Sequence, residues 1–446
     1  MRSSFTRRAF EIVTVLGGAA LRFAVYLLGQ ELLRTPGADR DEAAIQARGA
    51  VLLRQAIERL GATFIKLGQV MSTRPDLFPW PVIAELRKLQ DRLPGFAGAR
   101  ALVEAELGSA AAALVEFDEP PIAAASVAQV HRGRLATGEE VAVKVLRPEV
   151  RAQAEGDGEI LLWLAGILER LSGRASHAQL RDHLQHFLDG ILEQTDLRIE
   201  ARNYERFRHN FRKRRKVRFP RVHPELSSER VLTMSFVRGR KIDAIARGEF
   251  PELPRILREA FLQMCFDDGL LHADLHPGNF LVQDDGGITI FDVGLAKSLS
   301  DELLEHYIDF NRCLALGTVD DFMRHLRRFH SYVEGSVDWA ELERDMRAFH
   351  AEFLGRSAKD IEFGKIIDRV FSVGRKHGVR PVPDMTLMMV GLVTAEGIGK
   401  ALDPDVNSFQ EVANYLLPVL ARRNLLTPEL IEAASQAYAR AQAGAA

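Results

Sequence analysis

The segment from Leu271 to Gly294 restricts the fold and chemistry of this chain more than any other stretch. It begins Leu-His-Ala-Asp-Leu-His-Pro-Gly-Asn and ends Phe-Asp-Val-Gly after a short apolar interval. Asp274 and Asn279 are five positions apart around a Pro-Gly turn, the spacing of a catalytic loop for phosphoryl transfer. That chemistry needs a carboxylate to orient the nucleophile and ligands that hold Mg²⁺ on the phosphates.

The interval between Asn279 and Asp292 predicts a hairpin. Two apolar runs, 280–282 and 288–291, flank the turn residues 284–287. Such a hairpin would return Asp292 to the end that Asn279 occupies. A hard cation prefers an oxygen-only ligand set of this kind. The interval therefore predicts that both residues serve the same Mg²⁺ ion.

The histidines of this segment leave alternatives open. His272 and His276 are either an accidental pair or, with Asp274, ligands of a transition metal. Our preferred interpretation is that His272 braces the loop by hydrogen bonding. Asp274 alone could also cap a turn, so it is the joint pattern that favours phosphoryl transfer.

A lysine-bearing strand precedes this segment at 141–146. Alternation places Lys144 beside Ala142 on one face, opposite three valines. A lysine on a half-buried face needs an anionic partner, and Glu200, on a predicted helix, is our candidate together with phosphate. The structural alternatives are a lysine that extends from a sheet edge to solvent and a solvated helix glutamate.

The remaining pattern predicts helices, then strands, then helices. A helical periodicity runs from Leu53 to Met71 without a break, and helices fill roughly 150–211. The pattern predicts a hairpin of two strands, Val127–Leu135 and Glu140–Leu146. It also predicts a pair of strands around 217–219 and 231–237. After Gly294 a helix capped by Ser300 or Asp301 follows almost at once. No Ala-Pro-Glu element follows either, which argues against protein substrates.

These motifs resemble the UbiB/AarF/ADCK atypical kinase family of the protein-kinase-like superfamily. The resemblance covers roughly 45–300 by motif. Two motifs are specific to that family: Lys66-Leu-Gly-Gln69, which is similar to its Lys-x-Gly-Gln motif, and an alanine-rich loop at 121–131 in place of a glycine-rich one. The other matching elements are Asp196 with Glu200-Ala201, the catalytic segment His272–Asn279, and Asp292-Val-Gly294.

The resemblance implies an α+β, two-lobed kinase-like fold with ATP and Mg²⁺ as cofactors. It assigns nucleotide binding to the loop and strand, metal binding to two residues and catalysis to five. The nucleotide set is Ala123, Ala124, Ala125, Ser126 and Lys144; the metal set is Asn279 and Asp292; the catalytic set is Asp274, Lys144, Glu200, Lys66 and Gln69. Within it Asp274 orients the acceptor or water, Glu200 positions Lys144, and Lys66 and Gln69 gate access.

On this basis we expect four segments. They are an N-terminal amphipathic helix and linker (1–44), a helical extension with Lys66 and Gln69 (45–110), a small strand-rich lobe with inserted helices (111–238) and a helical lobe (239–446).

By resemblance the chain supports ubiquinone or related isoprenoid-quinone lipid biosynthesis. The implied partners are quinone precursors, quinone-biosynthesis proteins and a membrane surface. Two alternatives stay open: a small-molecule phosphotransferase of the aminoglycoside or choline kinase type, and a nucleotide-sensing, lipid-binding scaffold with little catalysis. One departure from the family pattern is Gln194, where the family has an acidic residue. A neutral amide cannot hold Lys66 as a carboxylate would.

Charge and cysteine content exclude other classes. With 59 Lys+Arg against 61 Asp+Glu the formal charge is −2, so we expect no nucleic-acid partner. Our preferred interpretation of the basic run 212–218 is a solvated helix end, and contact with anionic lipid is the second alternative. Only Cys265 and Cys313 occur, in no ligand spacing. A buried, reduced Cys265 fits a cytoplasmic protein.

The first 30 residues favour an amphipathic helix that packs on the protein or lies on the inner face of a membrane. Arg22 interrupts its apolar stretch. Neither half of this stretch, 10–21 or 23–28, reaches the ~20 apolar residues of a spanning helix, and the apolar run 385–393 is also too short. We therefore expect no transmembrane helix.

Overall fold

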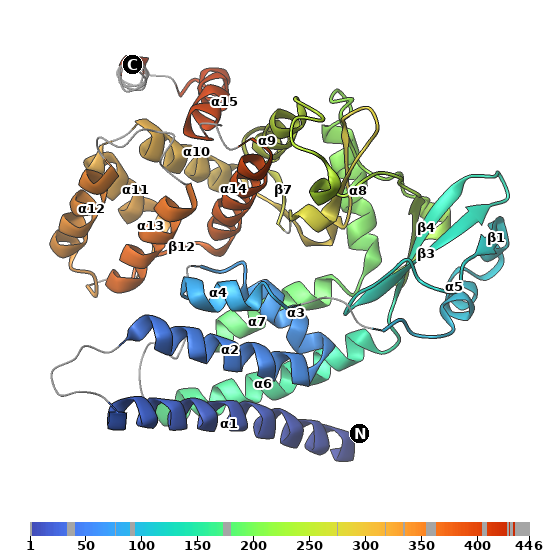
Figure 1. The fold of residues 1–446 in the computed structure, drawn as a ribbon, viewed down its shortest axis with the longest axis horizontal. Helices are drawn as coiled ribbons and strands as arrows, with labels where there is room; N and C mark the ends of the chain where they lie inside the picture. The colour runs from blue at the N-terminus through green and yellow to red at the C-terminus, as the bar shows by residue number, and fades with distance from the viewer. Residues whose placement is uncertain are drawn as a thin grey trace. The chain divides into compact units, whose positions relative to one another are not determined.

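A computed structural model of the chain describes residues 2–33, 41–75, 77–89, 94–172, 180–273, 275–316, 318–332, 335–353, 363–403, 408–425, 428 and 431–432. These residues form two compact units (Figure 1). Unit 1 comprises 1–73, 78–205 and 220–237, and unit 2 comprises 74–77, 206–219 and 238–446. The fold is α+β, as the sequence predicts.

Unit 1 contains an antiparallel sheet in the order β1-β3-β4-β6, with β2 paired to β3. The predicted hairpin is confirmed, because β3 and β4 pair along their length. Val141, Val143 and Val145 pack in one core with Ala99 and Val103 of α5. The strands are β1 (Leu114–Phe117), β2 (Ala123–Ala124), β3 (Ala128–Leu135), β4 (Glu140–Leu146) and β6 (Val231–Ser235), and α5 spans Ala99–Leu107.

The helices of unit 1 precede and interrupt this sheet. Figure 1 shows α1 alongside α2 and α6, and these helices are in contact. They are α1 (Arg2–Leu33), α2 (Glu42–Leu60), α3 (Ala62–Met71), α4 (Trp80–Leu86), α6 (Val150–Ser172), α7 (Leu180–Glu193) and α8 (Leu197–Asn210), with the unit boundary inside α8.

The expectation of one unbroken helix through 53–71 is wrong. Gly61 separates α2 from α3 with φ +89° and ψ −158°, a backbone conformation open to glycine and strained for other residues. The apolar steps continue on both sides, which is why periodicity alone missed the break. The chain therefore changes direction just before Lys66 and Gln69.

Arg8 anchors α1 within unit 1. Its guanidinium donates to both carboxylate oxygens of Asp157 on α6, at 2.7 and 2.9 Å, and to the carbonyl of Leu60 at 2.7 Å. It also lies 5.8 Å from the ring centroid of Phe64 on α3. The Asp157 carboxylate raises the pKa of Arg8 further above its usual value. The N-terminal helix thus packs on the protein, one of its two expected fates.

Two helices are long and apolar enough to cross a membrane on length and composition. They cover Phe5–Glu31 in α1 and Asp384–Leu402 in α14, so our expectation that both segments are too short is wrong. Most of α14 is buried in the fold, whereas almost none of the α1 segment is. Because a core helix meets the same criteria, the two helices are weak evidence for a span.

Unit 2 combines three small sheets with a mainly helical body. The sheets are β5-β9-β8, β7-β10 and β11-β12, and α14 packs against α9. The strands are β5 (Val217–Arg218), β7 (Leu270–His272), β8 (Phe280–Val282), β9 (Ile288–Ile290) and β10 (Ala296–Ser298), with a short pair β11 (His330–Ser331) and β12 (Arg380–Pro381). The helices are α9 (Leu253–Gln263), α10 (Asp301–Leu316), α11 (Val319–Phe329), α12 (Trp339–Phe353), α13 (Phe363–His377), α14 (Pro383–Leu402) and α15 (Ser408–Arg422).

The predicted pairing of strands around 217–219 and 231–237 is wrong. β5 pairs in parallel with β9 of unit 2, and β6 pairs with β4 of unit 1. The basic run 212–218 lies in the turn and strand after α8. There Arg218 pairs with Asp285, and Arg214 pairs with Glu259. Part of the run is therefore neutralised by acidic groups of its own unit.

Candidate functional site

β4 and α8 bring Lys144 and Glu200 together in unit 1. Lys144 Nζ donates to Glu200 Oε2 at 2.8 Å and to Oε1 at 3.0 Å. The glutamate side chain is only 5% exposed and the lysine side chain 17%. A carboxylate so buried is stable only with a close cation. The alternatives of a solvated glutamate and a solvent-directed lysine therefore do not describe this pair.

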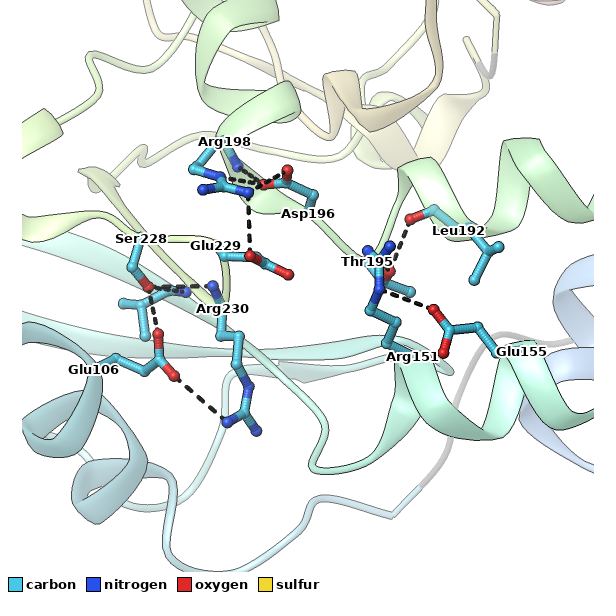
Figure 2. Close-up of polar contacts among 11 residues, drawn as sticks. Glu106, Arg151, Glu155, Leu192, Thr195, Asp196, Arg198, Ser228, Glu229 and Arg230 are labelled. Carbon is cyan, nitrogen blue, oxygen red and sulfur yellow. Dashed lines mark hydrogen bonds and ion pairs between the residues drawn. The ribbon is translucent and has the colours of Figure 1, made fainter.

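Asp196 secures the start of the helix that carries Glu200. Its Oδ1 accepts the backbone N–H of Arg198 at 3.0 Å, which caps the first turn of α8. Figure 2 shows Arg198 between Asp196 and Glu229, with contacts of 2.9 and 3.1 Å. The Arg198 guanidinium holds the pKa of the Asp196 carboxyl below its usual value. Sequence reasoning found Asp196 only as a motif match and missed this capping role.

The turn before α8 is tied to α6. Arg151 donates to the Thr195 hydroxyl at 3.3 Å, and that hydroxyl donates to the Leu192 carbonyl at 2.7 Å (Figure 2). Gln194, the departure from the family pattern, donates to the Gly190 carbonyl at 3.0 Å. Its amide is thus hydrogen-bonded to the last turn of α7, the helix directly before it.

Lys66 and Gln69 lie on α3. Lys66 is 9% exposed, and Gln69 is half-buried. Within the described part of the chain neither side chain has a hydrogen bond or ion pair. A nearly buried ammonium without an anion is costly, so Lys66 is a candidate to bind an anion that the described residues do not supply.

The alanine-rich loop is a tight hairpin between β2 and β3. Ala123 pairs with Val130, and the Ala125 N–H donates to the Ala128 carbonyl at 2.8 Å. Ser126 is fully buried within it. The Arg147 guanidinium donates to the carbonyls of Ala125 and Pro94, both at 2.8 Å. Sequence reasoning missed this support, whose only signal is a cation directly after β4.

In unit 2 the predicted hairpin between Asn279 and Asp292 is confirmed. β8 and β9 are antiparallel with Phe280 opposite Ile290, and the Phe291 N–H donates to the Asn279 carbonyl at 2.9 Å. Asn279 and Asp292 therefore lie at the same end of the hairpin. An amide and a carboxylate are oxygen ligands suited to Mg²⁺, so this donor set fits the metal.

Asp292 has a left-handed backbone, with φ +57° and ψ +57°. Aspartate tolerates this region better than most residues. Such a conformation persists only where the surrounding structure enforces it, and it clusters at functional sites. Asp292 lies between the hairpin and the turn Val293–Leu295.

The two histidines of the loop have separate contacts. His272 is fully buried, and its Nε2 lies 3.3 Å from the Phe291 carbonyl. His276 is exposed and accepts the Gly278 N–H at 3.0 Å. The contact of His272 with the Phe291 carbonyl is of the bracing kind that we expect for this residue. Asp274 lies outside the described residues.

The segment after Asp292 is as short as the sequence predicts. β10 pairs with β7, and α10 begins at Asp301. The Ser300 hydroxyl accepts the Leu303 N–H at 3.2 Å, which caps the helix.

The sheet with its lysine–glutamate pair and the hairpin with its loop define the class of protein as kinase-like. The model of the ABC1 atypical kinase-like domain matches residues 88–320, and that of the UbiB helical domain matches 346–407. The first match alone covers more than half of the chain. The chain therefore belongs to the ABC1/UbiB family of atypical kinase-like proteins.

Two solved structures are similar to this chain. One is Rv3197 from Mycobacterium tuberculosis, determined in a complex with erythromycin, which is 22% identical in sequence to this chain with a TM-score of 0.51. The aligned region covers 82% of this chain and 98% of Rv3197. That likeness shows the fold alone. The Rio2 kinase from Chaetomium thermophilum, in an ADP/Mg²⁺-phosphoaspartate complex, has 14% identity, a TM-score of 0.28 and coverages of 72% and 97%, too distant to carry an argument.

Proposed function

We propose that this chain is an ATP-dependent atypical kinase or ATPase. The observation that carries the proposal is the buried ion pair between Lys144 and Glu200. The pair holds the lysine ammonium on the sheet face opposite the valine core. A point charge fixed in this way is suited to bind phosphate oxygens. The nucleotide loop Ala123–Ser126, supported by Arg147, would cover the same ligand.

Unit 2 supplies the groups that we assign to metal and acceptor. Asn279 and Asp292 would hold Mg²⁺, which neutralises charge on the phosphates when bound. Asp274 would orient the acceptor hydroxyl, or water if the reaction is hydrolysis. We assign the gating of access to Lys66 and Gln69, because their polar ends have no hydrogen bond or ion pair among the described residues.

We further propose that the chain acts on or beside isoprenoid-quinone lipids at the inner face of a membrane. In support, α1 exposes large apolar side chains along its length, with Phe10 74% and Leu21 66% exposed. The free energy of such an apolar helix face is higher in water than at a lipid interface, so contact with lipid is favourable. Arg8 keeps the helix on unit 1, so the apolar face and the nucleotide groups belong to one body.

The test is Mg²⁺-ATP turnover with and without liposomes that contain anionic lipid and a quinone-precursor mimic. Wild type is compared with Asp292→Asn and with Asp284→Asn, an exposed carboxylate of the same hairpin. We expect turnover that rises with liposomes in wild type and Asp284→Asn and is lost in Asp292→Asn. Equal turnover in wild type and Asp292→Asn would contradict the metal assignment, and wild-type protein without turnover would favour the scaffold alternative.

A second test addresses the pathway. A quinone-deficient strain that lacks its own family member is supplied with wild type, Lys144→Ala or Lys88→Ala, the last an exposed lysine of the same unit. We expect wild type and Lys88→Ala to restore quinone and Lys144→Ala to fail. Equal rescue by all three would show that nucleotide binding does not matter for quinone supply.

A further inference from the structure

α10 and α11 bring a carboxylate, a thiol and an imidazole together in unit 2, away from the hairpin described above. Asp309 Oδ2 lies 2.9 Å from His325 Nδ1. Donor atoms of Asp309, Cys313 and His325 all lie within 4.8 Å of one another. Cys313 is 4% exposed and the His325 side chain is fully buried.

The spacing along the helices explains this convergence. Asp309 and Cys313 are four positions apart on α10, so their side chains share one face. α11 returns beside α10 and contributes His325. Ligand atoms around a tetrahedral zinc ion lie about 3.3–3.8 Å apart, given bonds of about 2.0 Å to nitrogen or oxygen and about 2.3 Å to sulfur. The three atoms therefore need only small rotations to close on one ion.

Surrounding residues hold the ligands in orientation. Arg312 donates to Asp309 Oδ1 from Nε at 2.9 Å and from Nη2 at 2.7 Å, which leaves Oδ2 directed at His325. The same Nη2 also donates to Cys313 Sγ at 3.3 Å. The ring centroids of Phe310 and Phe322 lie 5.5 and 6.4 Å from the centroid of the His325 imidazole. Oriented ligands in a dry pocket are what a tight metal site requires.

We propose that Asp309, Cys313 and His325 form a binding site for a divalent transition-metal ion of the zinc class. The ion takes one bond from each residue and a fourth from water. On binding, the S–H bond of Cys313 breaks, the sulfur–metal bond forms and the proton leaves to solvent. The site would pin α10 to α11.

A buried nitrogen beside the cluster supports the proposal independently. His330 Nδ1 is buried and has no hydrogen-bond partner within the described residues, and its ring centroid lies 5.7 Å from that of His325. A buried polar atom without a partner is unfavourable, and a metal-bound water would supply one. The cluster of Glu341, Asp345 and His377 has no fully buried member, whereas Cys313 and His325 are both buried. That second cluster carries no proposal.

The experiment uses the full chain without a histidine tag. Bound zinc is measured by elemental mass spectrometry, and Co²⁺ is then titrated into metal-free protein without nucleotide. We expect about one zinc per chain and, with Co²⁺, a strong near-ultraviolet thiolate charge-transfer band with tetrahedral visible absorption. Cys313→Ser should lose that band, whereas Cys265→Ser, the same change at the other buried thiol of unit 2, should keep it.

Two results would overturn the proposal. One is wild-type protein without zinc and without the charge-transfer band. The other is an equal band in Cys313→Ser and wild type. If Cys313→Ser fails to fold, the wild-type spectrum still decides. Co²⁺ at Asn279 and Asp292 would have oxygen ligands and no thiolate band, so the outcome is independent of ATP binding.

Discussion

Lys144 and Glu200, 56 residues apart in the chain, form a two-contact ion pair with both glutamate oxygens 2.8–3.0 Å from one ammonium. Glu200→Gln keeps the shape but removes the charge that fixes Lys144. We expect ATP turnover to fall at least about tenfold, because a mobile lysine no longer binds phosphate in one geometry. Stability should fall by about 1–3 kcal/mol, since a partly buried ammonium loses its partner.

The matched control is Glu104→Gln, which removes a carboxylate from an exposed ion pair with Arg100. Exposed pairs contribute about 0–1 kcal/mol, so both turnover and the urea midpoint should stay near wild type. Unchanged turnover in Glu200→Gln would mean that the pair is structural and does not position a nucleotide group.

The break at Gly61 can be tested by substitution. Because φ is +89° there, Gly61→Ala should lower the free energy of unfolding by about 1–2 kcal/mol. Gly156→Ala, inside α6 with open space around the added methyl group, should instead raise it by about 0.5–1 kcal/mol. Urea unfolding measures both. A stabilised Gly61→Ala would mean that α2 and α3 prefer to be one helix.

Arg8 is expected to hold α1 in place. Arg8→Ala leaves the Asp157 carboxylate, whose side chain is 2% exposed, without its main cation. We expect a loss of about 2–3 kcal/mol and faster amide hydrogen exchange in α1. Arg7→Ala, at an exposed neighbouring position, is the control and should change neither. Unaltered exchange in Arg8→Ala would show that apolar contacts alone hold the helix.

Asp268 gives the fold a specific pH dependence. Burial raises the pKa of its carboxyl from 3.8 to about 6. Between those values the folded protein binds a proton that the unfolded chain releases, so this group lowers stability as pH rises from about 4 to about 6. Asp268→Asn removes this dependence and should raise stability at pH 7 by about 1 kcal/mol. Urea midpoints across that pH range test it, and an unchanged slope would contradict it.

Local patterns predicted those parts of the fold and site in which neighbours along the chain decide the structure. Alternation in 141–146 placed Lys144 opposite the valine core, and turn residues placed Asn279 and Asp292 at one end of a hairpin. Both features follow from the two-residue period of strands. Ser300 was predictable as a cap because capping is local.

Other features depend on contacts that no local pattern encodes. β5 has two residues, too few for periodicity to reveal its partner β9. Arg8 and Asp157 lie 149 positions apart, and the break at Gly61 follows from how α2 and α3 pack. Asp309 and Cys313 share a visible four-residue spacing, but only the packing of α11 adds His325.

The most direct test of the central claim is equilibrium binding of ATP with and without Mg²⁺, measured by calorimetry. Asp292→Asn is compared with Asp284→Asn, because both lie beside the same hairpin and only Asp292 is assigned to the metal. The account predicts that Mg²⁺ tightens ATP binding in wild type and Asp284→Asn, and that this gain is lost in Asp292→Asn. Equal Mg²⁺ dependence in all three proteins would contradict it.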